Sequence, residues 1–294
     1  MQDRQGRAVL AVLGAGLCLS FGDAVVKLTS SSFSLWQVFT LRSWLVVLAF
    51  GTFAVVARVS MKPGPGLMRW GVARAVILVI MWLLYYAALP QMDFALAAAI
   101  YYTAPIFMAL MSVVFLSDRM TVLGWGSVAL GFAGVLLILK PAGNINPAVL
   151  LPVLSAGCYA AAMVLTRAKC RDEAPLTLAF LLHVTFVLVG IIGMLASPML
   201  GLEGYLGPHW ATMSAQAWLA MVVLAAAALV GSIFAAIAYQ NASPALVGTA
   251  DYSYVIFAVV WGALLFSEVP DAMSAVGIGC IVIAGAAMAT RGLR

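Results

Sequence analysis

Charged residues are scarce in this sequence. Asp, Glu, Lys and Arg make up 9% of its 294 residues, whereas 65% are hydrophobic and the mean hydropathy is +1.11. A soluble domain carries roughly 25% charged residues, because its surface has to be hydrated. The composition therefore excludes a soluble globular protein and predicts a surface that faces the lipid bilayer.

Cysteine and histidine are also few. The two histidines and the four cysteines lie far apart and show no Cys-x-x-Cys or Cys/His ligand spacing, the cysteines being Cys18, Cys158, Cys170 and Cys280. This pattern indicates neither a disulfide framework nor a zinc site. We expect the cysteines to be small apolar fillers, and we expect no metal and no cofactor.

Catalytic and nucleic-acid-binding motifs are missing as well. The chain has no His-Glu-x-x-His, Gly-x-Ser-x-Gly, Walker A or Gly-x-Gly-x-x-Gly pattern in a suitable context. Its basic residues do not cluster with interleaved aromatics, and no filter sequence is repeated, which argues against a nucleic-acid partner and against a channel. We therefore expect a protein that is neither an enzyme nor driven by ATP.

One enzymatic alternative stays open, the intramembrane aspartyl protease, because Asp23 and Asp251 both interrupt apolar runs. That class needs Gly-x-Gly-Asp, but Ser20 stands at the first glycine position before Asp23, and Ala250 precedes Asp251 in place of a tyrosine. The alternative is remote.

Long uncharged runs are what the sequence has in abundance. A bilayer core about 30 Å thick takes roughly 20 residues of helix, so the gaps between charges measure the spans. The pattern predicts an all-α membrane protein with ten transmembrane helices. The expected helices cover residues 8–29, 34–57, 68–90, 93–117, 121–140, 147–168, 175–197, 215–240, 244–267 and 271–291.

The lysines and arginines predict the orientation of these helices. Cytoplasmic loops of membrane proteins carry an excess of Lys and Arg. With a cytoplasmic N-terminus, the opposite side receives only Lys27 and Lys140, and the cytoplasmic side receives Arg4, Arg7, Arg58, Lys62, Arg69, Arg119, Arg167, Lys169, Arg171, Arg291 and Arg294. We expect both termini in the cytoplasm.

The two halves of the sequence resemble each other. An offset of 150 residues places Tyr102 over Tyr252, Ile106 over Ile256, Phe107 over Phe257 and Ser117-Asp118 over Ser267-Glu268, each before a Gly-rich span. A weaker match places Cys18 over Cys158 and Lys27 over Arg167. Each copy has five helices, an odd number, so the second copy enters the membrane from the opposite side and the two copies are inverted. We expect five-helix repeats at 1–143 and 144–294, as in many secondary transporters.

These segments carry a resemblance to a known family. The stretch from Tyr102-Thr103-Ala104-Pro105 to Ser117-Asp118, repeated from Tyr252 to Ser267-Glu268, resembles the close of an EamA-type repeat in the drug/metabolite transporter (DMT) superfamily. The resemblance covers essentially the whole chain. One departure is that the second copy has Val255 at the position of Pro105, and another is that the acidic residue is Asp118 in one copy and Glu268 in the other.

The resemblance implies a function. It implies a multi-pass transporter of the bacterial cytoplasmic (inner) membrane, a monomer that moves a small molecule by alternating access. Helices 1, 3, 4, 6, 8 and 9 would line a central cavity, with helices 5 and 10 peripheral. The nearest likeness is to YddG-like exporters of aromatic and neutral amino acids. Uptake or exchange of a riboflavin-like, nucleoside-like or organic-cation metabolite is the alternative on the same fold.

Ionisable groups at membrane depth are functional candidates, because they are costly unless paired. Asp23 and Lys27 stand one helical turn apart and can pair on the first helix, and Arg42 lies at a similar depth. We expect a gating or structural ion cluster here, with direct substrate contact as the alternative. Asp251 interrupts a cavity helix and is expected to accept a substrate ammonium or a proton, or else to be satisfied by a neighbouring hydroxyl.

Aromatic residues gather on the helices that the resemblance places at the cavity. An aromatic stripe also forms by packing or as an interfacial belt. The candidate substrate-binding residues are Trp82, Tyr85, Tyr86, Tyr101, Tyr102, Tyr159, Tyr239, Gln240, Asp251 and Tyr252.

Other residues have more ordinary expected roles. We expect a bend at Pro105, close helix packing in the Gly-rich spans, and a neutral, hydrogen-bonded His183 away from the cavity centre. Trp36 and Trp44 are expected at the membrane interface.

Overall fold

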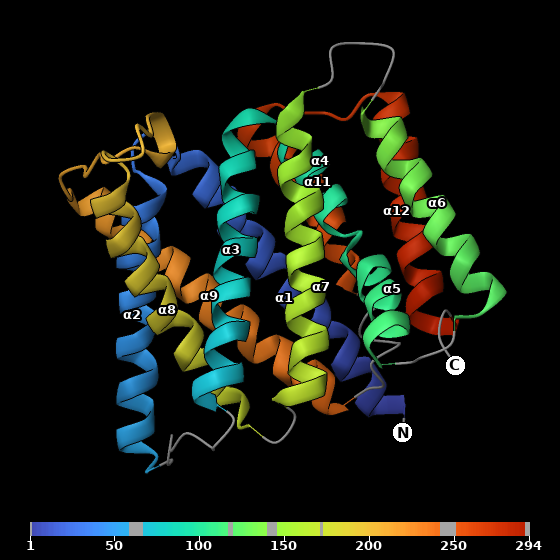
Figure 1. Cartoon of the computed structure of the whole chain (residues 1–294), viewed down its shortest axis with the longest axis horizontal. Helices are drawn as coiled ribbons and strands as arrows, with labels where there is room; N and C mark the ends of the chain where they lie inside the picture. The colour runs from blue at the N-terminus through green and yellow to red at the C-terminus, as the bar shows by residue number, and fades with distance from the viewer. Residues whose placement is uncertain are drawn as a thin grey trace.

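The computed structural model describes residues 2–58, 67–116, 120–139, 146–170, 173–241 and 251–291, and the regular elements within these ranges are helices (Figure 1). The first half contains α1 (Gln2–Thr29), α2 (Leu35–Val56), η1 (Leu67–Gly71), α3 (Val72–Ala88), η2 (Leu89–Gln91), α4 (Phe94–Tyr101), α5 (Ala104–Leu116) and α6 (Val122–Leu139). The second half contains η3 (Pro147–Val149), α7 (Leu150–Lys169), α8 (Pro175–Ala196), η4 (Gly204–Leu206), α9 (Ala215–Asn241), α11 (Ser253–Phe266) and α12 (Ala272–Arg291).

The described helices have the length and composition of membrane spans. Seven are long and apolar enough to cross a bilayer, and three shorter apolar helices lie at Val122–Ile138, Ser253–Phe266 and Ala272–Ala287. Short polar side chains begin several of them. Ser34 accepts a hydrogen bond from the Gln37 amide at the start of α2, and Asp271 accepts one from the Ser274 amide at the start of α12.

One expected helix is broken. The span expected at 93–117 is divided into α4 and α5 by a turn at Tyr102 and Thr103. Pro105 has no amide hydrogen to offer to the carbonyl of Tyr101, so the α-helical ladder stops there. The Thr103 side chain donates instead to the carbonyl of Ile100, over 2.7 Å.

A second turn occurs at the matching position in the other half. Asp251 is helical, Tyr252 is a turn residue, and α11 begins at Ser253, although no proline stands at Val255. The Tyr252 hydroxyl donates to the carbonyl of Tyr102 over 3.3 Å, so the two turns meet. The expected bend at Pro105 is thus present, and its counterpart forms without a proline. Residues 242–250, which include the start of the helix expected at 244–267, lie outside the described residues.

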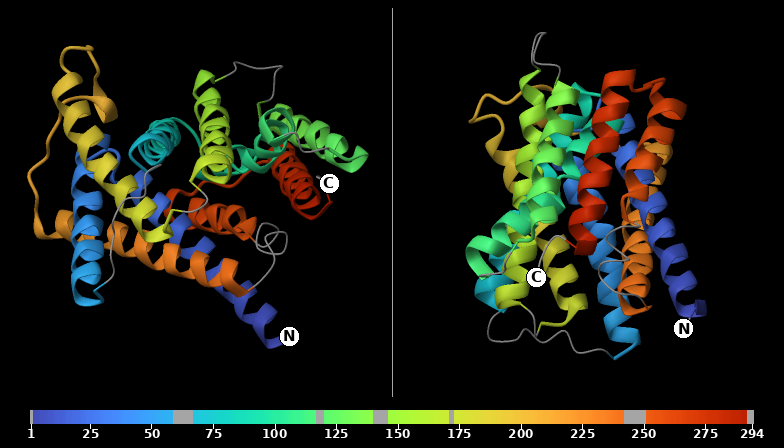
Figure 2. Two further views of the ribbon diagram at one scale, coloured as in Figure 1. Left: turned by 60° about the horizontal axis from the view of Figure 1, so that its bottom comes forward. Right: turned by 90° about the vertical axis from the view of Figure 1, so that its right-hand side faces the viewer.

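The helices pack in pairs that join the two halves of the chain. α1 lies against α9 and α11, α2 against α8, and α3 against α7, while α6 and α12 form a pair at one edge of the molecule (Figures 1 and 2). The expected close packing of the Gly-rich spans is confirmed. A side chain at Gly134 would meet the carbonyl oxygen of Gly277 at 2.7 Å, and the converse contact is equally close.

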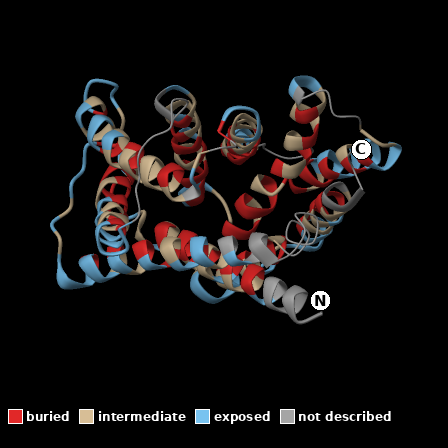
Figure 3. Cartoon of the chain, turned by 90° about the horizontal axis from the view of Figure 1, so that it is seen from below, coloured by how far each residue is buried: buried red, intermediate tan, exposed pale blue. Residues whose placement is uncertain are grey.

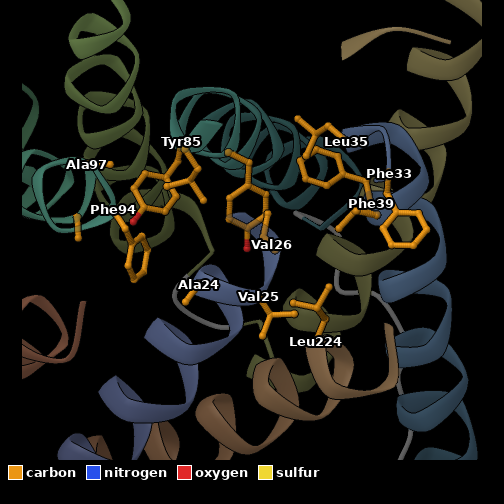
Figure 4. Close-up of a cluster of buried hydrophobic side chains, with 14 of the residues drawn as sticks. Ala24, Val25, Val26, Phe33, Leu35, Phe39, Tyr85, Phe94, Ala97 and Leu224 are labelled. Carbon is orange, nitrogen blue, oxygen red and sulfur yellow. The ribbon is translucent and has the colours of Figure 1, made fainter. Parts of the chain in front are cut away.

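Buried residues line the middle of the bundle, and exposed ones cover its outer faces (Figure 3). Many exposed side chains are large and apolar, such as Val122 and Leu264, as expected of a surface in contact with lipid. The main buried cluster joins α1, α2, α3, α4 and α9 (Figure 4). Trp36 is not at the surface. It is 6% exposed, donates from Nε1 to the carbonyl of Leu206 and fills the space beside Gly193, whereas Trp44 is 51% exposed.

Candidate functional site

A buried carboxylate lies at the centre of the bundle. Asp23 on α1 is 4% exposed and accepts hydrogen bonds from the hydroxyls of Tyr86 on α3, over 2.8 Å, and Tyr254 on α11. Because Tyr254 donates to Asp23, Tyr85 is the donor in the 3.3 Å contact between the Tyr85 and Tyr254 hydroxyls. The carboxylate therefore ties three helices together.

A buried cation lies on the other side of Tyr86. Arg42 on α2 is 6% exposed, and its Nη1 donates to the Tyr86 hydroxyl over 2.9 Å. Its guanidinium also faces the rings of Tyr86 and Phe186 at 5.6 and 5.1 Å. The Tyr86 hydroxyl thus links Arg42 to Asp23, and the expected cluster of Asp23 with Arg42 is formed through this bridge.

Both charged residues line one small cavity, of about 120 Å³, between α1, α2, α3, α8 and α9. Trp82, His183 and Ser232 contribute to its wall, together with apolar side chains such as Phe186. The Nε of Arg42 and the Nδ1 of His183 are buried without a hydrogen-bond partner in the described protein. His183 was expected away from the cavity centre, but it lines this cavity, because α8 faces the interior at this residue.

Aromatic rings extend from this cavity into the bundle. We use the name aromatic cluster for the contacting rings of Trp82, Tyr85, Tyr86, Tyr101, Tyr102, Tyr159, Tyr252 and Tyr254. Tyr85 and Tyr86 are fully buried, whereas Trp82, Tyr101, Tyr102 and Tyr159 are half-buried. The structure therefore brings together the aromatic residues that the sequence singled out and leaves some of their surface accessible.

Asp251 sits beside the turn residue Tyr252. It is half-buried, and its side chain is hydrogen-bonded to Tyr102. The Tyr252 ring occupies space that Gly285 leaves open, since a side chain at Gly285 would overlap its hydroxyl. Tyr239 and Gln240, also predicted to bind substrate, lie outside the residues whose side chains the structure describes.

An ion pair joins the last turn of α1 to the segment that follows α11, and we call it the Lys27–Glu268 lock. Lys27 Nζ lies 2.5 Å from Glu268 Oε1 and donates to the carbonyl of Met92 over 2.7 Å. Glu268 Oε2 also accepts from the amide of Phe94, at the start of α4. The lock joins α1, α4 and the segment after α11.

The expected pair of Asp23 with Lys27 along α1 is therefore wrong. Lys27 lies one turn nearer the end of the bundle, where Glu268 reaches it, and the tyrosine hydroxyls satisfy Asp23 in the interior. Ser267 makes this possible, because its left-handed backbone, with φ of 57°, turns the chain back after α11.

A wider cavity, of about 710 Å³, lies next to the lock and is lined by Lys27, Ser31, Tyr205, His209 and Phe266 among others. The Tyr205 hydroxyl is buried without a partner in the described chain. Burial raises the pKa of this hydroxyl above its ordinary value, against the opposing effect of the Arg42 charge. Tyr205 therefore stays protonated at physiological pH.

The contacts of three residues at this site could not be predicted from the sequence. Glu268 was recognised as the acidic end of a repeat, but not as the partner of Lys27. The sequence does not single out Tyr254 as a partner of Asp23, and it gives His183 no place at the cavity. The repeat itself was the available signal for Glu268, because a conspicuous acid at a helix end needs a cation nearby.

Two stretches of the chain match one transporter family. The match to the EamA-like transporter family covers residues 6–140 and again residues 146–290. The chain belongs to the EamA-like transporter family. It is thus a multi-pass membrane transporter of the DMT superfamily, and the match points to a transporter rather than an enzyme.

Relatives of this EamA-like transporter carry different names. The chain is 26% identical over 282 residues to the pseudopaline exporter CntI of Pseudomonas aeruginosa (strain UCBPP-PA14), covering 94% of this chain and 93% of that protein. It is 32% identical over 205 residues to a riboflavin transporter of Rhizobium johnstonii (strain DSM 114642 / LMG 32736 / 3841), covering 69% and 63%. A crystal structure of a protein with 19% identity superposes with a TM-score of 0.60 over 97% of this chain and 98% of that one, so the fold is shared.

Proposed function

We propose that this EamA-like transporter exports aromatic and other neutral amino acids across the bacterial inner membrane by alternating access. The observation that carries the proposal is the aromatic cluster, which shares Trp82 and Tyr86 with the charged cavity. Aromatic rings pack against apolar side chains, and opposite charges suit the ammonium and carboxylate of an amino acid. The exporter among the relatives supports the direction of transport.

The proposal includes the membrane topology. Ten spans would form inverted repeats at 1–143 and 144–294, with both termini in the cytoplasm and the Lys27–Glu268 lock on the periplasmic side. Supporting this arrangement are the two family matches, the seven long and three shorter apolar helices, and the turns at Tyr102 and Tyr252. Each chain would hold both halves of the transport path and would act as a monomer.

Counterflow in proteoliposomes tests the function. Purified protein is reconstituted with a panel of unlabelled amino acids inside and labelled L-phenylalanine or L-threonine outside. We expect accumulation of label that depends on the internal amino acid. If folded protein gave no counterflow with any amino acid, amino-acid export would be rejected.

A second candidate is transport of a riboflavin-like, nucleoside-like or cationic metabolite. The riboflavin transporter among the relatives favours this alternative for riboflavin. The same assay with labelled riboflavin distinguishes the two, because export of amino acids predicts no riboflavin counterflow.

A further inference from the structure

Two side chains on the cavity of about 120 Å³ each have a buried nitrogen without a hydrogen-bond partner in the described protein. Arg42 and His183 both line it, and each has a buried ring or guanidinium nitrogen without a partner in the described protein. Arg42 is 94% buried and uses Nη1 for Tyr86, which leaves Nε unpaired. Buried polar groups in native proteins are usually hydrogen-bonded, so these two nitrogens are candidates for contact with a bound ligand.

The charges around the cavity indicate which kind of ligand it suits. No carboxylate of the described chain lies within ion-pair distance of Arg42. Asp23, on the same cavity, already accepts from Tyr86 and Tyr254. Arg42 therefore still has Nε available to donate, whereas the Asp23 carboxylate is already hydrogen-bonded, so the cavity suits a second, negatively charged acceptor.

The size and lining restrict that anion. A volume of 120 Å³ corresponds to about four water molecules at liquid density, well below the roughly 300 Å³ at which pockets enclose a whole ligand. Leu182, Phe186 and Leu224 supply apolar wall, so the one buried arginine suits a group with one negative charge. A carboxylate fits this description, and guanidinium groups bind carboxylates through charge-assisted hydrogen bonds.

We propose that Arg42 Nε and His183 Nδ1 bind the carboxylate of the transported metabolite, whose remaining part lies toward Trp82 and the aromatic cluster. This inference rests on the proposed function and deepens it, because it makes a carboxylate a requirement for transport. Riboflavin, nucleosides and simple organic cations lack that group. Tyr86 accepts from Arg42 and donates to Asp23, so its hydroxyl links the carboxylate site to α1.

Binding to the purified full chain tests the carboxylate site separately from transport. The probes are L-phenylalanine, 3-phenylpropanoate, which lacks the ammonium, 2-phenylethylamine, which lacks the carboxylate, and inorganic phosphate. We expect the first two to raise the unfolding temperature of the wild-type protein, and the amine and phosphate to have no effect. Stabilisation by the amine or by phosphate equal to that by 3-phenylpropanoate would overturn the proposal.

Binding of 3-phenylpropanoate to variants tests which residues form the carboxylate site. Arg42→Gln should weaken binding of 3-phenylpropanoate by about tenfold to one hundredfold, as expected for loss of a charged hydrogen bond. His183→Phe keeps the ring contacts with Phe50 and Phe186 and should weaken binding less. Arg74→Gln is the matched control, since Arg74 donates to Thr166 away from this cavity, and its binding should be unchanged. If Arg42→Gln does not fold, Arg42→Lys, which keeps the positive charge, replaces it in the binding test.

The outcomes separate this inference from the proposed function. Amino-acid counterflow whose KM is the same in Arg42→Gln, Arg42→Lys and wild type would overturn the carboxylate site and leave the function standing. Arg42-dependent binding of 3-phenylpropanoate without any amino-acid counterflow would support the site and reject amino acids as the cargo.

Discussion

Buried charges in this bundle are satisfied between helices rather than along one helix. Asp23 binds tyrosines from α3 and α11, and Lys27 binds Glu268 from beyond α11. A pair within α1 would stabilise only that helix, whereas the observed contacts fix how the helices lie against one another. In the proposed alternating-access cycle, breaking these contacts would allow the helices to separate.

A charge exchange tests the Lys27–Glu268 lock. Lys27→Glu and Glu268→Lys should each lower the counterflow rate, because like charges then face each other and hold that end open. The double variant should recover most of the rate, with a coupling free energy of about 0.5–3 kcal/mol. Counterflow of labelled L-phenylalanine measures this. Additive losses in the double variant would show that the ion pair has no part in transport.

Asp251 is tested by a substitution that keeps its size. Asp251→Asn removes the negative charge and should reduce transport severalfold without lowering expression, because a neutral amide neither attracts an ammonium nor carries a proton. Asp271→Asn is the control, since asparagine also caps a helix start and α12 should be unaffected. Unchanged transport in Asp251→Asn would remove this carboxylate from the mechanism.

The sequence could predict which residues gather at the site, but not all of their pairings. The family resemblance placed the helices that carry these aromatic residues around one cavity, and the structure brings their rings into contact. The partner of Lys27 could not follow, because Glu268 is distant in sequence and reaches the lysine only through the turn at Ser267. His183 was misplaced because its cavity depends on how α8 packs against α2.

At the scale of elements, the turns at Tyr102 and Tyr252 have different local causes. Pro105 interrupts the first helix through its missing amide hydrogen, a signal that can be read from the sequence. No proline is present near Tyr252, where the turn accompanies contact of its ring with Tyr102 and Gly285. Sequence therefore predicted a bend in one copy, whereas the second depends on tertiary packing.

The crossing of α6 and α12 gives a stability prediction. Gly134→Ala or Gly277→Ala should destabilise the protein by about 1–3 kcal/mol, because the added carbon lies 2.7 Å from a backbone oxygen of the partner helix. Gly126→Ala and Gly279→Ala are matched controls on the same helices, where nothing lies within 4 Å, and they should be neutral or slightly stabilising. Thermal unfolding in detergent provides the measurement, and equal transition temperatures for both pairs would contradict the close crossing.

At the scale of the whole molecule, apolar composition was enough to predict an all-helical membrane protein, since exposed apolar side chains cover its outer faces. Which helices pair was not accessible from hydropathy, because lipid-facing and buried positions are equally apolar. The observed pairs join the two halves, with α1 on α9 and α11 and α3 on α7. Movement of one half against the other would therefore change the small cavity and the lock together.

Alternating access requires that the substrate cavity open to one side of the membrane at a time. The native cysteines are first replaced by alanine. Nitroxide labels are then attached at Ser31→Cys and Val269→Cys, two exposed positions beside the lock, and the distance between the labels reports whether that side opens. A second pair, at Phe132→Cys and Val276→Cys on α6 and α12, controls for overall loosening. We predict that L-phenylalanine produces an additional, longer label-to-label distance in the first pair and leaves the distance in the second pair unchanged. One unchanged distance in the first pair, in protein that performs counterflow, would contradict the account.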